Sequence, residues 1–245
     1  MMTPMTSGNA RADMLSQNLT ALRARIAAAC AAAGRPAGDV TLVAITKTFP
    51  ASDVRLLAGL GVTDVGENRD QEAAQKAAEC ADLAPPLRWH FVGQLQVNKS
   101  KSVVRYADVI HSVDRPRLVE ALGSRARAVG RVITCLIQVD LDPGPDSGSA
   151  RGGARPGDVP ALASQVAAAG GLVLGGVMAV APLGAPPRPA FRRLAEIAGA
   201  VRAAHHGAMM ISAGMTGDLE EAIAEGATHV RVGTALLGSR RAFVR

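Results

Sequence analysis

The sequence of 245 residues is poor in aromatic residues, with four Phe, one Trp and one Tyr. So few rings exclude the base-stacking platforms of proteins that bind single-stranded nucleic acid. Lysine is also scarce, because only Lys47, Lys76, Lys99 and Lys101 occur among 27 basic residues. The formal net charge is +6, but the arginines stand singly or in pairs. We therefore expect a solvated surface and no nucleic-acid partner.

Cysteine is rare as well. Cys30, Cys80 and Cys135 lie far apart and have neither a C-x-x-C nor a metal-binding spacing. A dispersed, odd set of cysteines is typical of a reducing compartment. The N-terminus is polar, without the apolar core of a signal peptide, and no apolar stretch reaches the roughly 20 residues of a membrane span. The sequence predicts a cytoplasmic protein with no metal site and no membrane partner.

Strand and helix patterns alternate along the chain. We expect residues 1–13 to be a flexible N-terminus and residues 14–33 to form a helix, because apolar residues recur there every three or four positions. Short, β-branched apolar runs follow, each succeeded by a helical pattern. The expected strands are Val40–Thr46, Val62–Val65, Arg88–Val92, Asp108–Ser112, Val132–Asp140, Leu172–Val180, Met209–Ala213 and His229–Gly233.

Eight such units in about 250 residues predict an α/β fold, a single (β/α)8 TIM barrel over residues 14–245 with an extra N-terminal helix. An open doubly wound sheet is the alternative, although no G-x-G-x-x-G follows the first strand. The Gly- and Pro-rich segment Leu141–Gly157 interrupts the rhythm after the fifth strand. In a barrel it lies on the face where active sites are built, either as a plain loop or as a flap over a ligand.

Lys47 is the first candidate for chemistry. It shares one face of the first expected strand with Val43 and Ile45, so it points inward at the carboxyl end of that strand. Apolar surroundings disfavour its ammonium form, which makes the amine nucleophilic toward an aldehyde. A lysine that extends to solvent is the alternative reading.

Two Gly-, Ser- and Thr-bearing loops follow the last two expected strands, at Ser212–Gly217 and Gly233–Ala235. Barrel enzymes commonly bind phosphate there, since glycine admits the ligand to backbone N–H groups at a helix N-terminus. Barrel closure makes the second loop a neighbour of Lys47. An aldehyde for the lysine and a phosphate for the loops point to pyridoxal 5′-phosphate (PLP). Arg231 is expected to point inward, where it would keep the pyridine nitrogen unprotonated.

The chain resembles the pyridoxal phosphate homeostasis protein family from about Met14 to Gly238, and this family is similar to the barrel domain of alanine racemases without their second domain. The segments that carry the resemblance are Leu42–Thr48, Gly66–Glu72, Trp89–Lys99, His111–Asp114, Ile211–Asp218 and Val230–Gly238. The resemblance implies a Schiff base with PLP on Lys47 and Arg231 at the pyridine nitrogen. It also implies Ser212, Gly233 and Thr234 at the phosphate and Asn68, His90 and Met215 along the pocket.

The implied function is PLP binding in intracellular PLP homeostasis, by buffering the free aldehyde and supplying apo-enzymes, without catalytic turnover. A one-domain PLP-dependent amino-acid racemase and a Schiff-base aldolase without cofactor stay as alternatives. Against the racemase, the single tyrosine Tyr106 is expected to pack. A monomer is expected, with a dimer left open. Phe49, Arg151 and Arg155 stand where the family often has lysines, which puts any role of those lysines in passing PLP on in doubt.

Overall fold

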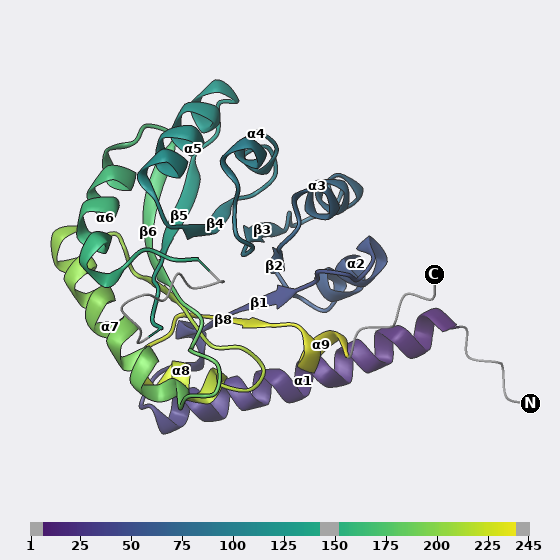
Figure 1. Cartoon of the computed structure of the whole chain (residues 1–245). Helices are drawn as coiled ribbons and strands as arrows, with labels where there is room; N and C mark the ends of the chain where they lie inside the picture. The colour runs from purple at the N-terminus through teal and green to yellow at the C-terminus, as the bar shows by residue number, and fades with distance from the viewer. Residues whose placement is uncertain (1–6, 143–151, 239–245) are drawn as a thin grey trace, which may run out of the picture.

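The structure is a computed structural model that describes residues 7–142 and 152–238. Eight parallel strands pair in chain order and close into a barrel, with β8 hydrogen-bonded to β1 (Figure 1). The strands are β1 Thr41–Ile45, β2 Asp64–Glu67, β3 Arg88–Phe91, β4 Val109–Val113, β5 Ile133–Gln138, β6 Leu172–Met178, β7 Met210–Ser212 and β8 His229–Val232. The predicted (β/α)8 barrel is confirmed, and the open-sheet alternative is wrong.

Each expected strand is present, but the second one is displaced toward the C-terminus. The apolar run Val62–Val65 predicted that strand, whereas β2 spans Asp64–Glu67. Val62 instead closes the end of the preceding helix, because its backbone N–H donates to the carbonyl of Leu57 at 3.0 Å. An apolar run can be divided between a helix end and a strand, which hydrophobic periodicity alone does not separate.

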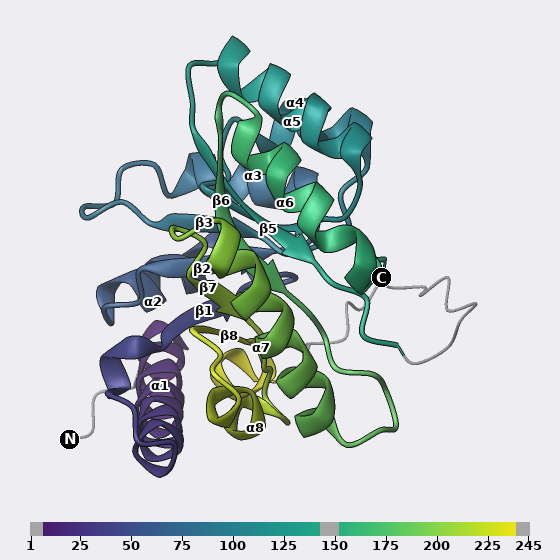
Figure 2. The same ribbon diagram turned by 90° about the vertical axis from the view of Figure 1, so that its left-hand side faces the viewer.

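Helices cover the outside of the barrel, and α2 to α7 follow one another around it (Figures 1 and 2). The α-helices are α1 Ser7–Ala32, α2 Ala51–Gly59, α3 Asp70–Glu79, α4 Ser100–Val103, α5 Pro116–Ala128, α6 Val159–Ala168, α7 Pro187–Ala204, α8 Leu219–Ala224 and α9 Thr234–Leu237. The 3-10 turns are η1 Ala37–Asp39, η2 Val97–Lys99 and η3 Pro156–Asp158. Among the described residues, no helix is both long and apolar enough to cross a bilayer.

The strands separate an apolar outer layer from a polar interior. On β8, Val230 and Val232 are fully buried in the cluster that also contains Leu15 and Leu22 of α1. His229 and Arg231, which alternate with these valines, are buried as well but face the interior, where Arg231 donates to the Ser212 carbonyl and the His229 ring lies 6.3 Å from the ring of His90. The predicted orientation of Arg231 is thus confirmed by its position inside the barrel.

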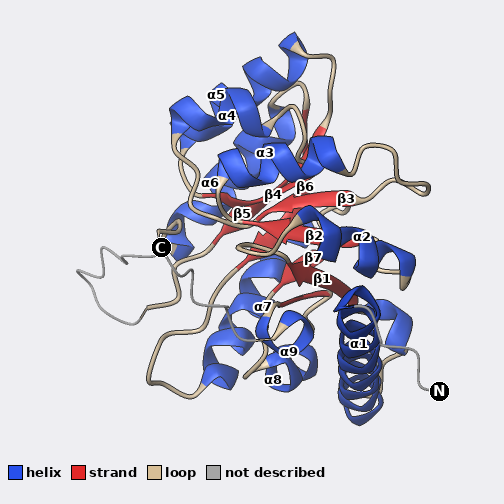
Figure 3. Ribbon diagram, turned by 90° about the vertical axis from the view of Figure 1, so that its right-hand side faces the viewer, coloured by secondary structure: helices blue, strands red, loops and turns tan. Residues whose placement is uncertain are grey.

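The additional helix α1 braces the loops after β7 and β8. Its Asn18 side chain donates to the carbonyl of Leu236 at 3.0 Å, near the end of α9. Arg25 donates to the carbonyl of Thr216 at 3.1 Å and pairs with Glu220 of α8. In Figure 3, α1 runs beside both α8 and α9. Asn18 thus satisfies a carbonyl that α9 leaves open in its last turn, and Arg25 holds the loop that precedes α8.

Part of the segment Leu141–Gly157, including Arg151, lies outside the described residues. The chain then returns to the barrel at Gly152, whose carbonyl accepts a bond from the Gln138 side chain at 3.0 Å. Ala154 forms an isolated parallel bridge with Val139, just after β5. The choice between a plain loop and a flap therefore stays a prediction.

Candidate functional site

Closure of the barrel brings Lys47 and Gly233 to the same part of the rim. Strands β1 and β8 pair with Val43 opposite Arg231, and a Cβ added at Gly233 would lie 3.2 Å from the Ile45 carbonyl oxygen. Lys47 stands two residues beyond Ile45, half-buried in the turn that follows β1. A side chain at position 233 would occupy the space beside this turn, so glycine keeps it open.

A buried ionic cluster supports the backbone just before Lys47. The Lys76 ammonium donates at 2.7 Å to each of three oxygens: the Thr46 carbonyl, Glu67 Oε1 and Glu72 Oε1. The Thr46 hydroxyl also donates to Glu67 Oε1, at 2.7 Å. Burial raises the pKa of the Glu67 carboxyl, and its second oxygen is buried without a hydrogen-bond partner among the described residues. Two strands and α3 thus hold the start of the turn.

The same cluster holds the backbone just after Lys47. Thr48 has a φ of 71°, a left-handed conformation that a β-branched residue rarely adopts. Its backbone N–H donates to Glu72 Oε1, which offsets the conformational cost. The backbone on both sides of Lys47 is therefore held by hydrogen bonds. The residues next to Lys47 in the sequence do not predict these bonds. The Glu72 and Lys76 pair, four residues apart on a helix, was the available signal.

The loop after β7 needs glycine at position 214. Gly214 has a φ of 89°, and a Cβ there would come within 2.7 Å of the Ala222 Cβ. Met215 is 40% exposed, and its backbone N–H donates to Asp218 at 2.6 Å. Thr234, the first residue of α9, is also exposed. The two loops therefore leave Met215 and Thr234 at the carboxyl-end rim.

A continuous hydrogen-bonded chain crosses the barrel interior. Asp64 Oδ1 lies 2.8 Å from His90 Nε2, and His90 Nδ1 lies 2.8 Å from His111 Nε2. His111 Nδ1 lies 3.0 Å from the Ser212 hydroxyl oxygen, to which Arg231 Nη1 donates at 2.7 Å. Sequence analysis missed Asp64 and His111 as members of this site. The signal was their even spacing from Gly66 and Val109, which places them on inward faces.

His90 and Ser212, which the resemblance places at the pocket and the phosphate, lie inside the barrel. His90 is 1% exposed and Ser212 is fully buried. Asn68 lies nearer the rim, at the carboxyl end of β2, and lines a cavity of about 310 Å³ together with Phe91 and Gln94. Asn68 Oδ1 is buried without a hydrogen-bond partner among the described residues.

Arg231 is a buried cation held by neutral acceptors. Its Nη1 donates to the carbonyl and hydroxyl of Ser212, at 2.8 and 2.7 Å, and its Nη2 donates to the Ala179 carbonyl at 2.9 Å. Burial lowers the pKa of Arg231 to about 10, so the guanidinium keeps its charge at neutral pH. Within the part of the chain that the structure describes, no carboxylate lies in salt-bridge contact with it.

Tyr106 and Phe49 lie away from the hydrogen-bonded series of side chains in the barrel interior. The hydroxyl of Tyr106 donates to Asp70 at 3.4 Å, and its ring packs against both large apolar clusters, as expected. The guanidinium carbon of Arg11 lies over the ring of Phe49, 5.5 Å from the ring centroid. Phe49 thus belongs to the packing between α1 and the turn after β1.

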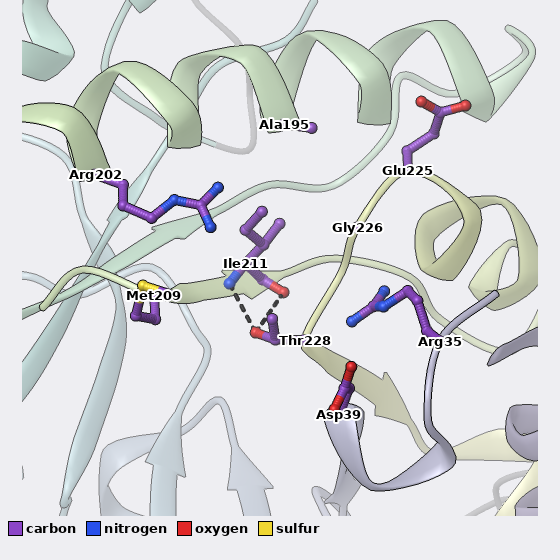
Figure 4. A pocket seen from close by; sticks show the side chains of 9 residues that line it. All are labelled: Arg35, Asp39, Ala195, Arg202, Met209, Ile211, Glu225, Gly226 and Thr228. Carbon is purple, nitrogen blue, oxygen red and sulfur yellow. Dashed lines mark hydrogen bonds between the residues drawn. The ribbon is translucent and has the colours of Figure 1, made fainter. Parts of the chain in front are cut away.

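A cavity of about 530 Å³ lies elsewhere, beside the amino end of β7 (Figure 4). Thr228 and Ile211 border it and are joined by hydrogen bonds. Arg35, on its other side, donates to the carbonyls of Ile223 and Ala227. Arg35 is therefore committed to backbone carbonyls, and the cavity lies at the end of the barrel opposite Lys47.

The buried histidines predict that acid destabilises the fold. Burial lowers the pKa of His229 from 6.5 to about 4, and also lowers those of His90 and His111. Between pH 4 and pH 6.5, these histidines bind more protons in the unfolded state than in the folded state. The free energy of unfolding therefore falls as the pH drops from 6.5 to 4. For His229 the loss is about 3 kcal/mol.

Urea unfolding between pH 7 and pH 4 measures this dependence, and His229→Gln should show a visibly flatter profile than the wild type. The raised pKa of Glu67 acts in the opposite direction but is common to both proteins, so it cancels in the difference. Parallel profiles for the two proteins would contradict the prediction.

Comparison with known proteins places this geometry in a family. The profile of the alanine racemase N-terminal domain matches residues 17–241. A pyridoxal phosphate homeostasis protein of Mycobacterium tuberculosis is 44% identical over 248 residues, which cover 94% of this chain and 95% of the relative.

Solved structures agree with this assignment. A protein from Bifidobacterium adolescentis has a TM-score of 0.85 at 32% identity, over 96% of this chain and 97% of its own. PipY of Synechococcus elongatus PCC7942, solved with PLP bound, has a TM-score of 0.79 at 34% identity, over 91% of this chain and 100% of its own. The chain belongs to the pyridoxal phosphate homeostasis protein family, whose barrel is that of the alanine racemase N-terminal domain.

Proposed function

We propose that this chain binds PLP at the rim where β1 meets β8 and serves PLP homeostasis in the cell. The observation that carries the proposal is the juxtaposition of Lys47 with Gly233 and Thr234, above the buried guanidinium of Arg231. The PLP-bound structure of PipY, a relative over nearly the whole chain, supports it. PLP supplies an aldehyde that condenses with an amine, together with a phosphate that anchors it.

The residues at the rim fit such a ligand. Gly233 leaves room beside the turn of Lys47, and Thr234 presents its hydroxyl and the first N–H groups of α9. Asn68 Oδ1 is a buried acceptor without a partner among the described residues, at the next strand end along. We propose that Gly233 and Thr234 hold the phosphate, and that Asn68 and Met215 border the ring.

We propose Lys47 as the amine for covalent attachment, because its turn lies beside Gly233 at the barrel rim. Lys76 is buried with its ammonium bonded to three oxygens, so it is not available to an aldehyde. Lys99 and Lys101 are exposed on η2 and α4, and Lys99 lines the cavity that also contains Asn68. The turn of Lys47, by contrast, is held from both sides by the cluster around Lys76.

Covalent attachment to Lys47 is tested by borohydride reduction of the PLP-loaded protein and peptide mapping. The label should lie on the peptide that contains Lys47. Lys47→Ala should lose the covalent label and keep weaker binding through the phosphate, whereas the matched control Lys101→Ala, an exposed lysine of α4, should behave as the wild type. A label mainly on Lys76, Lys99 or Lys101 would contradict the assignment of Lys47 as the site of attachment.

The phosphate contact is tested by comparing PLP with pyridoxal, which lacks the phosphate. Thr234→Val removes one hydroxyl donor, and a charge-assisted hydrogen bond contributes about 1.5–3 kcal/mol. Binding of PLP should weaken by roughly tenfold or more, while pyridoxal binding changes little. Thr20→Val, an exposed threonine of α1, is the control. Equal losses for both ligands would mean that Thr234 only supports the fold.

We propose that the protein carries PLP without efficient turnover. Racemisation needs one acid/base group on each face of the substrate's α-carbon, and Lys47 supplies one. The single tyrosine, Tyr106, is committed to packing and to Asp70 outside the barrel mouth. Arg231 keeps its proton, so a pyridine nitrogen facing it stays unprotonated and stabilises a carbanion poorly.

Proton NMR in D2O with saturating L- or D-alanine tests this absence of turnover in the PLP-loaded protein. The α-proton signal should persist, and the opposite enantiomer should not accumulate. Loss of that signal at enzyme-like rates would favour the one-domain racemase instead. An aldolase that uses Lys47 without a cofactor is separated by the ultraviolet-visible spectrum of the purified protein, since it carries no PLP chromophore.

The cellular setting follows from the same proposal. We propose a cytoplasmic monomer that limits free PLP and supplies apo-enzymes. Its three cysteines are buried free thiols, in keeping with a reducing compartment. Position 49, two residues after Lys47, is a phenylalanine that stacks under Arg11. No charged side chain therefore stands at this position to assist transfer of PLP.

A further inference from the structure

We propose that Asp64, His90 and His111 form a one-way hydrogen-bond relay that positions Ser212 and Arg231. The relay turns the Ser212 hydroxyl hydrogen into the barrel, away from the rim. His90 and His111 are then positioning residues for Arg231, and Ser212 is not a donor to phosphate. The inference deepens the proposed function, on which its consequence for PLP rests, but the relay itself concerns only this chain's own atoms.

The direction of the relay follows from its first member. An ionised carboxylate only accepts hydrogen bonds, so the hydrogen between Asp64 and His90 belongs to His90 Nε2. In a neutral imidazole the other nitrogen is then an acceptor. His90 Nδ1 therefore accepts from His111 Nε2–H, 2.8 Å away. Both rings carry their hydrogen on Nε2.

The same reasoning continues to the arginine. His111 Nδ1 has become an acceptor, so the Ser212 hydroxyl donates its hydrogen to it across 3.0 Å. Arg231 is always a donor, and its Nη1 donates to the oxygen of the same hydroxyl at 2.7 Å. Every donor in the chain points toward Asp64. The one hydrogen of Ser212 is used within the interior.

A proton on His90 would reverse the relay. Its Nδ1–H would donate to His111, whose Nδ1–H would donate to Ser212, and the Ser212 hydrogen would be released. That state places a second cation in the interior that already contains Arg231, against the one carboxylate of Asp64. Neutral rings keep one positive and one negative charge at the two ends, which costs less in a desolvated barrel.

The groups around His90 and His111 support the neutral state. Arg88 of β3, Arg231 and His229 of β8 disfavour a further positive charge, whereas Asp64 and Asp108 favour it. Desolvation outweighs these influences and lowers the pKa of both rings. His90 and His111 are therefore neutral at physiological pH.

The consequence concerns the ring end of the bound ligand. Two of the three hydrogen bonds that Arg231 donates go to Ser212, whose hydroxyl orientation is fixed by His111. Loss of the relay would free the Ser212 hydroxyl to rotate away from Arg231, and the guanidinium would then be held only by the backbone carbonyls of Ser212 and Ala179. The relay thus sets the group that meets the pyridine nitrogen, and leaves the phosphate to Gly233 and Thr234.

Two-bond 1H–15N correlation spectra of histidine-labelled protein test the relay without PLP. His90 and His111 should both be neutral at pH 7, with protonated Nε2 and unprotonated Nδ1. The variants His90→Gln and His111→Gln assign the signals, and His229→Gln, the third histidine of the interior, should leave both tautomers unchanged. A hydrogen on His111 Nδ1, or a charged ring, would overturn the proposal.

The consequence for ligand binding is tested with Ser212→Ala. Because Ser212 acts through Arg231, the variant should weaken the binding of PLP and of pyridoxal by the same factor. It should also shift the absorbance of bound PLP. A selective loss for PLP would show a phosphate donor and overturn the assignment. His111→Phe should reproduce the shift, and His111→Gln, which can accept and donate at the same ends, should restore most of it.

The two proposals fail in different ways. If the wild type binds no PLP, the proposed function fails while the tautomer measurement still decides the relay. If PLP binds and His111→Phe keeps the wild-type affinity and spectrum, the positioning role is wrong although the proposed function stands. Thermal unfolding of each variant in the absence of PLP shows whether it is folded for these comparisons.

Discussion

The parallel pairing of β1 with β8 is the constraint on which the candidate site depends. It closes the barrel and sets Val43 opposite Arg231, which brings the turn of Lys47 next to Gly233 from opposite ends of the chain. The same β8 backbone divides its side chains by alternation. Val230 and Val232 pack outward beneath α1, while Arg231 enters the interior. A slip of one residue would exchange these faces, so outer packing and site geometry require the same register.

The polar interior is a second constraint, because buried charges destabilise a fold unless their hydrogen bonds are satisfied. Here one cation, Arg231, and one carboxylate, Asp64, are separated by two imidazoles and a hydroxyl. An all-apolar interior would pack without this desolvation cost. A satisfied polar chain instead holds a guanidinium in one orientation before any ligand arrives, and such preorganisation favours binding.

Support for the rim comes from outside the barrel as well. Asn18 and Arg25 of α1 bond carbonyls in the segments after β8 and β7, respectively. On the other side, Lys76 of α3 bonds the carbonyl of Thr46. Short loops carry few contacts of their own, so a long helix and a buried ion cluster supply what they lack. The residues proposed to touch PLP are therefore positioned by residues that do not.

The sequence by itself determined the number of strands, their inward and outward faces, and the positions of Lys47, Arg231 and Gly233 at the end of the barrel, because alternation of apolar residues reports the face of a strand directly. It did not separate Val62 from β2, since a helix end and a strand share one apolar run there. Only the tertiary structure decided three features: the depth of His90 and Ser212 in the barrel, the partners of Lys76, and the relay through His111. Their hydrogen bonds join side chains from different strands, and alternation within one strand carries no record of what lies across the barrel.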